Sequence, residues 1–398
     1  MKLAERMTVV QGSQTSGMRN LAMRLRAEGK SVVNFAAGEL DEGLSEVVIN
    51  AARQAVYSGT NKYTETVGIR PLRDAIAARL ERQTGLPWSW EEIAVTAGAK
   101  QALFNSAMVL FNPGDEVLVP APYWTTFPTQ ISLTGAKAVF VDTADSGYRL
   151  TADLVARHIG PKSRAIIINT PNNPTGHVIP AEVLEQIAVL VRENGLWVIY
   201  DQCYSTFVYD DRRHVNLLEV APDLKDRTVV VDSFSKSHAL AGWRIGYAAA
   251  PKHVIQAVSN FQGHTTSNPN SIAQVAALAA LESQDDDYHS AVRARLEGNR
   301  ARGLEILKAL RGVRVAAPEG GFYFYLKIPR DRWPAGSGIS PDSGCTSLAE
   351  RLLAEAQIAV VDGEAFGDFG GIRLSYAIDS QEVEAGLMRL VHCFQRHE

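Results

Sequence analysis

Short apolar runs alternate with amphipathic segments through the middle of the chain, and this alternation limits the folds that the chain can adopt. The apolar runs lie at residues 116–119, 137–141, 165–169, 197–200, 228–231 and 245–248. Strands this apolar are buried on both faces, as in a largely parallel sheet. Residues 72–84 and 181–194 carry apolar side chains at three- and four-residue spacing, which suits crossover helices. The pattern predicts an α/β fold.

The chain is long enough for two lobes, and its second part has a different pattern. One hydrophobic core stops growing at about 250–300 residues, whereas this chain has 398. An Ala- and Arg-rich stretch at 270–310 is typical of helix, and short strands return at 313–315, 322–326, 359–361 and 371–375. We therefore expect an N-terminal segment of residues 1–45 that joins the small domain, a large domain of residues 46–290, and a small α+β domain of residues 291–398. Residues 330–344, rich in Pro, Gly, Ser and Asp, predict a mobile surface loop.

Composition and charge argue against several kinds of partner. The net charge of −4, with no block of like charges, leaves no basic surface for nucleic acid. Cys203, Cys345 and Cys393 match neither a disulfide framework nor a zinc site, and the nine histidines show no metal-binding spacing. The N-terminus lacks the apolar core of a signal peptide, and no apolar run is long enough to span a membrane. These features favour a cytoplasmic protein with small-molecule partners and no metal.

Reactive side chains follow three of the predicted strands. Asn173 comes after the run at 165–169, Asp201 and Tyr204 come after 197–200, and Lys236 comes after 228–231. Because ligands of open α/β sheets bind beyond the carboxyl ends of the strands, we expect these side chains to lie close together. A partly desolvated amine can form a Schiff base with a carbonyl group, whereas a solvated amine is protonated and reacts poorly. Lys236 is therefore the candidate nucleophile.

This set of residues suits a pyridine cofactor. A carboxylate opposite the ring nitrogen, for which we choose Asp201, keeps that nitrogen protonated and lets the ring accept electrons from a substrate carbanion. Tyr204 and Asn173 can bond the ring hydroxyl, and the indole of Trp124 can stack on the ring. Ordinary structural roles stay open, since Asp201 could cap a helix and Trp124 could be a core residue.

A phosphate group on such a cofactor would find donors in two further segments. Residues 98–105 follow the strand-like run 93–96 and open a helical pattern, so Ala99 and Lys100 lie at a helix N-terminus that attracts anions. Ser233, Ser235 and Arg244 would complete this anion site, with Arg244 as a bidentate partner. Arg244 could instead form a structural ion pair, and Lys100 could be a solvated residue at a helix start.

Three further residues are placed by their sequence context. Arg373 lies in the strand-like run of the second lobe, where a guanidinium suits forked recognition of a carboxylate that arrives between the lobes. Cys203 is expected to be an inert buried thiol. His238, although close to Lys236, is expected to be a packed loop residue and not a second base.

Together these motifs resemble the class I aminotransferases of the fold-type I pyridoxal-phosphate enzymes, and among them the bacterial aspartate-type branch. The likeness runs from about Arg19 to Arg389 and rests on residues 169–176, on Asp201 with Tyr204, on 233–236 with Arg244, and on 372–377. The resemblance implies a large domain with a mostly parallel seven-stranded sheet between helices, plus a smaller α+β domain. It also implies that Lys236 holds pyridoxal 5'-phosphate and then moves the α-proton of an L-amino acid, which exchanges its amine with a 2-oxo acid.

The resemblance implies a role for each residue that matches a family motif. Asp201 would pair with the pyridine nitrogen, Tyr204 and Asn173 with the ring oxygen, and Trp124 with the ring face, while Arg373 and the backbone of Gly38 would bind the substrate α-carboxylate. Tyr63 matches a tyrosine that reaches the phosphate of the neighbouring subunit, which implies a homodimer with shared active sites. Lys100 and residues 13–15 match the aspartate branch, where the lysine meets a distal carboxylate.

Two departures from the family pattern leave the reaction outcome open. Gln202 follows the ring-nitrogen aspartate where the family commonly has an acidic residue, and Leu40 replaces the usual proline after Gly38-Glu39; both are expected to alter the substrate side of the site. The alternative is a related enzyme of specialised metabolism that performs β- or γ-elimination, replacement or cyclisation. A third hypothesis is the effector-binding module of a transcription regulator, which would need a DNA-binding fusion.

Overall fold

A computed structural model describes residues 3–8, 10, 12, 14–283, 286–329 and 345–396. Its largest sheet has seven strands in the order β2-β8-β7-β6-β5-β3-β4. The bounds of these strands are β2 (Ile93–Thr96), β3 (Glu116–Ala121), β4 (Lys137–Asp142), β5 (Ser163–Asn169), β6 (Trp197–Asp201), β7 (Thr228–Ser233) and β8 (Gly246–Ala249). Each predicted run of the large lobe is a strand, and β8 alone runs antiparallel to its neighbours β7 and β2. The α/β prediction is confirmed.

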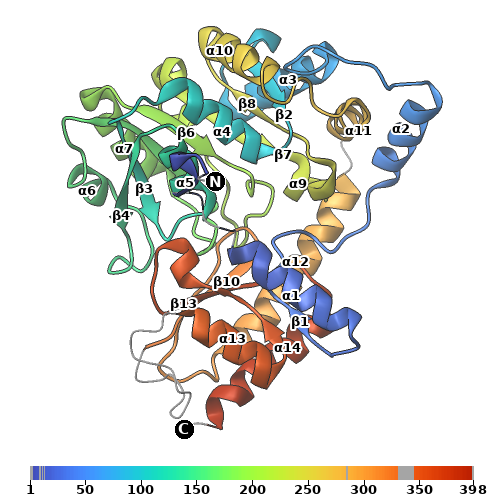
Figure 1. The fold of residues 1–398 in the computed structure, drawn as a ribbon, viewed down its shortest axis with the longest axis vertical. Coiled ribbons are helices and arrows are strands. Elements are labelled where there is room, and N and C mark those ends of the chain that lie inside the picture. The colour runs from blue at the N-terminus through green and yellow to red at the C-terminus, as the bar shows by residue number, and fades with distance from the viewer. Residues whose placement is uncertain are drawn as a thin grey trace.

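Both faces of this sheet are buried, which explains why its strands are apolar throughout. Side chains of β5, β6 and β7 alternate between two hydrophobic clusters: Ile166, Ile168 and Tyr200 belong to one, and Ile167 and Ile199 to the other. Helices cover the two faces (Figure 1). The helices of the large lobe are α2 (Glu46–Tyr57), α3 (Arg70–Thr84), α4 (Ala99–Leu110), α5 (Thr126–Leu133), α6 (Ala152–Ala156), α7 (Ala181–Asn194), α8 (Leu217–Val220), α9 (Phe234–Ser237), α10 (Lys252–Gly263) and α11 (Ser271–Glu282).

The crossover helices begin and end where the sequence signals predict. Pro180 precedes α7, and Gly195 follows it in a left-handed conformation with φ of 63°. Gly85 ends α3 in the same way, with φ of 69°. Glycine adopts this conformation without the steric cost that a Cβ would bring, so both helices stop at that residue.

The C-terminal lobe contains a second, smaller sheet and the N-terminal helix. Four strands pair in the order β12-β13-β10-β9, and β1 (Val33–Asn34) pairs in parallel with β11 (Ile358–Ala359). The remaining bounds are β9 (Arg314–Ala316), β10 (Tyr323–Lys327), β12 (Val361–Asp362), β13 (Gly371–Ser375), α1 (Gln14–Ala27), α12 (Asp286–Leu307), α13 (Cys345–Ala356) and α14 (Ser380–Gln395). In Figure 1, α1 lies against this lobe, and α12 extends from the large lobe into it.

One prediction for this lobe is confirmed and one needs correction. The stretch 270–310, predicted to be helical, contains α11 and α12. The run 359–361 is divided between β11 and β12, which belong to different sheets, because its two ends pair with distant strands. The loop predicted at 330–344 lies outside the described residues, and the domain boundaries at 45 and 290 stay a prediction. Within the described residues, every helix is too short or too polar to span a lipid bilayer.

Candidate active site

A cavity of about 670 Å³ opens at the carboxyl ends of β5, β6 and β7, against the C-terminal lobe. It brings together residues from segments that are far apart in the sequence. Of the predicted site residues, it is lined by Gly38, Ala99, Lys100, Trp124, Asn173, Asp201, Tyr204, Ser233, Ser235, Lys236, Arg244 and Arg373. Tyr63 is the predicted residue that does not line the cavity, and it is 91% exposed.

Lys236 points its amine into this cavity from α9, the short helix that follows β7. The residue is partly buried, and its Nζ donates a hydrogen bond to the backbone carbonyl oxygen of Gly38. The rings of Tyr204 and Phe322 each lie 5.9 Å from Nζ. The amine therefore has a polar partner and two aromatic rings near it, and it is partly shielded from water.

Asp201 lies at the end of β6 with only 4% of its surface exposed. Its carboxylate accepts a hydrogen bond from the backbone N–H of Cys203 at 3.1 Å, and the thiol of Cys203 is a second, weak donor to it. Burial raises the pKa of Asp201 to about 6, and the charge of the nearby Asp232 adds to this shift. A buried carboxylate with so few donors fits a protonated ring nitrogen, which would supply the missing positive partner.

The opposite end of the cavity is built for an anion. Gly98, with φ of 81°, precedes α4 and exposes the first N–H groups of that helix. The guanidinium of Arg244 lies across this turn, donating to the carbonyl oxygens of Ala241 at 2.8 Å and Ala97 at 3.2 Å. Glycine adopts this φ without the strain that a side chain would bring, and a Cβ at position 98 would also lie 2.8 Å from a nitrogen of Arg244. With Ser233 and Ser235 beside it, this end fits a phosphate group.

Arg373 reaches the cavity from β13 and is almost fully buried, with 3% exposed. Its nitrogens donate to Oδ1 of Asn173 at 3.0 Å and to the carbonyl oxygen of Ala36 at 3.2 Å, and its guanidinium lies 4.3 Å from the ring centre of Tyr323. Among the described residues no carboxylate forms an ion pair with it. A buried guanidinium without an acidic partner suits a carboxylate ligand.

Lys100 adds a further cation to the cavity, near Trp124. Its Nζ lies 5.1 Å from the centre of the Trp124 ring. Burial lowers the pKa of Lys100, and the charges of Arg244 and Lys236 lower it further. Three cations so close together favour an anionic ligand.

Several cavity residues were not predicted from the sequence. Arg19 of α1 forms an ion pair with Glu39 at 3.2 Å, and the hydroxyls of Tyr204 and Tyr323 are 2.9 Å apart. The burial of Tyr204 and its contact with Tyr323 raise the pKa of Tyr204 well above the ordinary value. Tyr323 lies in a strand that the sequence did predict, but the pattern of that strand does not tell which of its side chains faces the cavity.

The two departures from the family pattern do not lie where they were expected. Gln202 is fully buried and Leu40 is 8% exposed, and neither lines the cavity. Leu40 packs in the core of the C-terminal lobe. The expectation that both alter the substrate side of the site is therefore wrong in geometric terms, because no substrate in the cavity would touch them.

Cys203 and His238 are buried, as expected. Burial raises the pKa of the Cys203 thiol well above its usual value, helped by the charge of Asp201. Burial also lowers the pKa of His238, as does the neighbouring His289. Both residues are therefore neutral at physiological pH.

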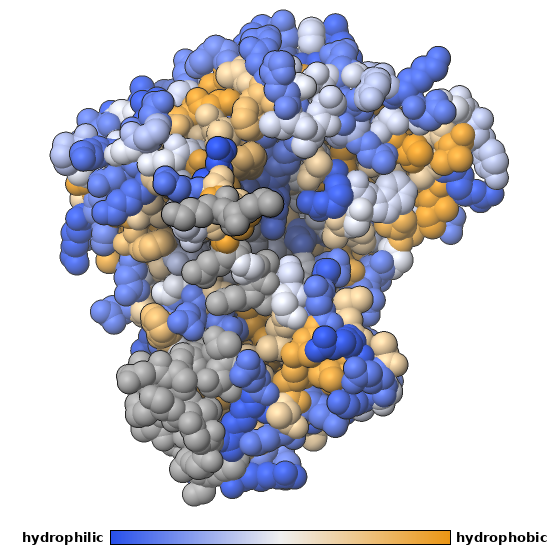
Figure 2. All heavy atoms as spheres, viewed as in Figure 1, coloured by the Kyte–Doolittle hydropathy of each residue, from blue (hydrophilic) through white to orange (hydrophobic). Residues whose placement is uncertain are grey.

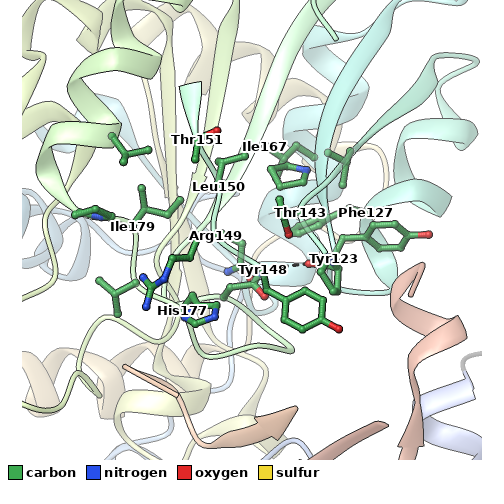
Figure 3. Close-up of a pocket in the computed structure, with 18 residues that line it drawn as sticks. Tyr123, Phe127, Thr143, Tyr148, Arg149, Leu150, Thr151, Ile167, His177 and Ile179 are labelled. Carbon is green, nitrogen blue, oxygen red and sulfur yellow. Dashed lines mark hydrogen bonds between the residues drawn. The ribbon is translucent and has the colours of Figure 1, made fainter. Parts of the chain in front are cut away.

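A second cavity, of about 150 Å³, is lined in part by Pro122 and Tyr123, which precede Trp124 in the sequence (Figure 3). It is lined mainly by apolar side chains such as Phe127, Leu150 and Ile167, with His177 at one side. None of the predicted site residues lines it. The larger cavity is therefore the candidate active site.

Known proteins resemble the chain over almost its full length. The model for aminotransferase class I and II matches residues 30–390. This chain belongs to that family. It is 38% identical to an aspartate/prephenate aminotransferase of Thermus thermophilus, over 99% of both chains, and 35% identical to an aspartate aminotransferase of Geobacillus stearothermophilus, over 98% of both.

Solved structures agree with this assignment. The aspartate aminotransferase from Thermus thermophilus with maleate superposes on this aminotransferase with a TM-score of 0.92 at 36% identity, covering 98% of this chain and 99% of that one. The aspartate aminotransferase from Rhizobium meliloti gives a TM-score of 0.92 at 34% identity over the whole of both chains. The chain is a fold-type I, pyridoxal-phosphate-dependent aminotransferase that acts between an amino acid and a 2-oxo acid.

Proposed function

We propose that this aminotransferase uses an aspartate-like amino acid as donor and that the residues of the large cavity divide into a cofactor set and a substrate set. The observation that carries the proposal is the single cavity in which Lys236, Asp201, Arg244 and Arg373 meet. Pyridoxal 5'-phosphate, when bound, accepts the electrons released at the α-carbon of the amino acid.

In the cofactor set, Lys236 would hold the aldehyde carbon and Asp201 would pair with the ring nitrogen. Tyr204 and Asn173 would bind the ring oxygen, and Trp124 would cover one ring face. The phosphate would be held by the first turn of α4, at Ala99 and Lys100, with Ser233, Ser235 and Arg244. This assignment is supported by the helix N-terminus beside the guanidinium and by the scarcity of donors to Asp201.

In the substrate set, Arg373 binds the α-carboxylate with help from Asn173, which already accepts a hydrogen bond from it at 3.0 Å. The backbone of Gly38 closes the same side of the cavity. Its carbonyl oxygen accepts a hydrogen bond from the amine of Lys236, and a Cβ on Gly38 would lie 3.8 Å from a nitrogen of Arg373, so the amine and the guanidinium lie on the same side of the cavity. Nζ of Lys236 is then placed to take the α-proton.

We propose that Lys100 recognises a second carboxylate of the donor. Lys100 and Arg373 are both in the cavity, and neither has an acidic partner among the described residues. Two relatives carry aspartate in their names, and one solved relative is described with maleate, a four-carbon dicarboxylate. Thr15 also lines the cavity, whereas Ser13 lies outside the described residues.

We further propose a homodimer in which Tyr63 completes the phosphate site of the partner subunit. Tyr63 is 91% exposed and Tyr57, at the end of α2, is 80% exposed. Val47 and Val56 of α2 are also exposed, and Figure 2 shows apolar surface over this helix. Apolar surface of this kind is typical of an interface between subunits. We keep the prediction of a cytoplasmic enzyme, where the free thiols Cys203 and Cys393 stay reduced.

The test is turnover with product analysis. With aspartate and 2-oxoglutarate, the purified holoenzyme is expected to form glutamate in step with the loss of aspartate. With a donor that carries a leaving group on its β-carbon, release of pyruvate together with ammonia, and without glutamate, would support elimination instead. Failure with all twenty amino acids would contradict the proposal. The sequence grounds for elimination, Gln202 and Leu40, lie outside the cavity lining.

A further inference from the structure

Two polar side chains lie side by side behind Asp201, outside the cavity. Asp232 is in β7, the strand next to β6, and Gln202 follows Asp201 directly. The backbone N–H of Gln202 donates to the carbonyl oxygen of Val231, which sets Gln202 beside Asp232. Gln202 is fully buried, and Asp232 is 4% exposed. The roles proposed above use neither of them.

Hydrogen bonds fix which end of the Gln202 amide faces Asp232. The backbone N–H of Leu218 donates to Oδ1 of Asn216 at 2.9 Å, so the other end of the Asn216 amide is its NH₂ group. That group donates to Oε1 of Gln202 at 2.7 Å. The NH₂ group of Gln202 must then point the other way, where it meets Oδ2 of Asp232 at 3.4 Å and Oε1 of Gln83 at 3.2 Å. A backbone donor thus determines the whole chain of contacts.

Asp232 lies among few positive charges. Its Oδ1 accepts from the N–H of Ser233 at 2.7 Å, and its Oδ2 also accepts from the hydroxyl of Tyr247 at 3.3 Å. The charged or titratable groups that act on this pair or share its cluster are Arg79 of α3, Tyr247 of β8, Asp201 at the end of β6 with Cys203 just beyond it, and His214, whose Nε2 lies 3.4 Å from Oε1 of Gln202. Burial raises the pKa of Asp232, and the charge of Asp232 in turn raises the pKa of Asp201. A change of charge at this pair therefore reaches the carboxylate that faces the cofactor.

We propose that Gln202 is a positioning residue for the cofactor site. Its amide donates a hydrogen bond to Asp232, and because the amide is neutral, this pair contributes one carboxylate, and not two, next to Asp201. The proposal rests on the proposed role of Asp201 toward the ring nitrogen. A glutamate at 202 would place a carboxylate oxygen where the amide donor now meets Asp232. Two carboxylates this close cannot both ionise without a cation between them, so one takes up a proton or the pair separates.

The test exchanges the amide and the acid between the two positions. Gln202→Glu creates two acids, Asp232→Asn creates two amides, and the double variant restores one of each in the opposite order. Each holoenzyme is titrated with pH while the visible absorbance of the bound cofactor is followed, and its dissociation constant for pyridoxal 5'-phosphate is measured. A role in packing alone would not move the midpoint of the absorbance titration.

We expect Gln202→Glu to weaken cofactor binding by about tenfold or more and to shift the absorbance midpoint. The double variant should return both values to within about threefold and a few tenths of a pH unit of the wild type. If Gln202→Glu does not fold, recovery of folding and cofactor binding in the double variant gives the same support. Gln83→Leu removes a neutral partner of the same amide and should leave the midpoint unchanged.

Two results would overturn the proposal. One is a Gln202→Glu protein with the midpoint and affinity of the wild type. The other is a double variant that is no better than Gln202→Glu alone. Failure of the proposed function is distinct, because wild-type protein would then bind no cofactor or transfer no amine.

Discussion

At the scale of single residues, the buried carboxylate of Asp201 makes the protein without cofactor less stable. Its pKa of about 6 lies above the ordinary 3.8, so ionisation in the folded state costs on the order of 3 kcal/mol. This cost is present above about pH 6 and disappears toward pH 3.8, where the folded and unfolded states are both protonated. In its proposed role, Asp201 would gain a positive partner from the ring nitrogen of the bound cofactor, which the protein without cofactor lacks.

Asp201→Asn is therefore expected to stabilise the protein without cofactor at pH 7.5 and to weaken its binding of pyridoxal 5'-phosphate. The gain should shrink as the pH falls toward 4, since the carboxyl group is then neutral in both states. Urea unfolding at the two pH values and a cofactor titration measure these effects. Asp226→Asn, on the exposed surface, is the control, and a destabilised Asp201→Asn protein would contradict the expectation.

Lys100 offers a second prediction at this scale. Loss of a charge-assisted hydrogen bond of about 1.5–3 kcal/mol should raise the KM of Lys100→Ala for aspartate by roughly 10- to 100-fold. The KM for alanine, which has no second carboxylate, should change little. Steady-state kinetics with both donors make the comparison, and Lys137→Ala, on an exposed strand position, is the control. Equal losses for aspartate and alanine would assign Lys100 to the cofactor phosphate instead.

Single site residues could be predicted from the sequence only where they lie at or just after the end of a recognisable strand. Asp201 and Lys236 each follow a buried strand, and the carboxyl ends of parallel strands meet at one edge, so their convergence could be expected. Arg19 lies in an ordinary amphipathic helix, and nothing local indicates that it contacts Glu39. Gln202 was interpreted as a substrate-side residue because its position in the motif does not tell which way its side chain points.

At the scale of elements, Glu319 joins the loop after β5 to the start of β10. Its side chain is 6% exposed and binds Arg149 at 2.6 Å, Arg212 at 3.1 Å and the N–H of Val178 at 3.0 Å. Burial alone would raise the pKa of Glu319, but hydrogen bonds with His177, Arg149 and the Val178 N–H outweigh it and hold the pKa well below its usual range. The loop that carries Asn173 is thereby fixed to the second lobe.

Glu319→Gln is expected to lower the free energy of unfolding at pH 7 by about 2 kcal/mol, because the charge-assisted hydrogen bonds of the buried carboxylate are lost. The effect is no larger because Arg149 and Arg212 are half exposed and water can solvate them. A lowered folded pKa means that the carboxylate stabilises the fold above about pH 4.5 and that this contribution is lost as the pH falls further. The difference between variant and wild type should therefore shrink at pH 3. Urea unfolding at both pH values tests this, with the surface variant Glu185→Gln for comparison; a difference that grows in acid would be inconsistent with it.

The elements themselves were largely predictable, and the exceptions share a physical cause. α7 (Ala181–Asn194) and β13 (Gly371–Ser375) have the predicted bounds, since glycine and the apolar period mark their ends locally. The run 359–361 was predicted as one strand, yet its two parts pair with β1 and β13. Pairing depends on segments more than 300 residues away in one case, and no local pattern contains that information.

At the scale of the whole molecule, the proposed sharing of active sites predicts complementation between two inactive proteins. In a dimer of one Tyr63→Ala chain and one Lys236→Ala chain, the site of the first chain keeps its own Lys236 and receives Tyr63 of the partner subunit. Mixing and refolding the two proteins should therefore restore about a quarter of the wild-type activity, because about half of random dimers are hybrids and each has one intact site.

The control for this experiment mixes Lys236→Ala with Asp201→Asn. Both changes affect the site of their own chain, so no hybrid site is intact and no activity should return. Equal results from the two mixtures, or a Tyr63→Ala protein that keeps full cofactor affinity, would show that Tyr63 does not cross to the partner.

The most direct measurement is the chemical identification of the lysine that carries the cofactor. Borohydride treatment of the holoenzyme makes the lysine–cofactor bond permanent, and mass spectrometry of the digested protein then locates it. We expect the added mass on the peptide that contains Lys236, and none in protein incubated first with excess aspartate. The added mass on another lysine, or on no lysine at all, would contradict the role given to Lys236 and with it the proposed chemistry of the cavity.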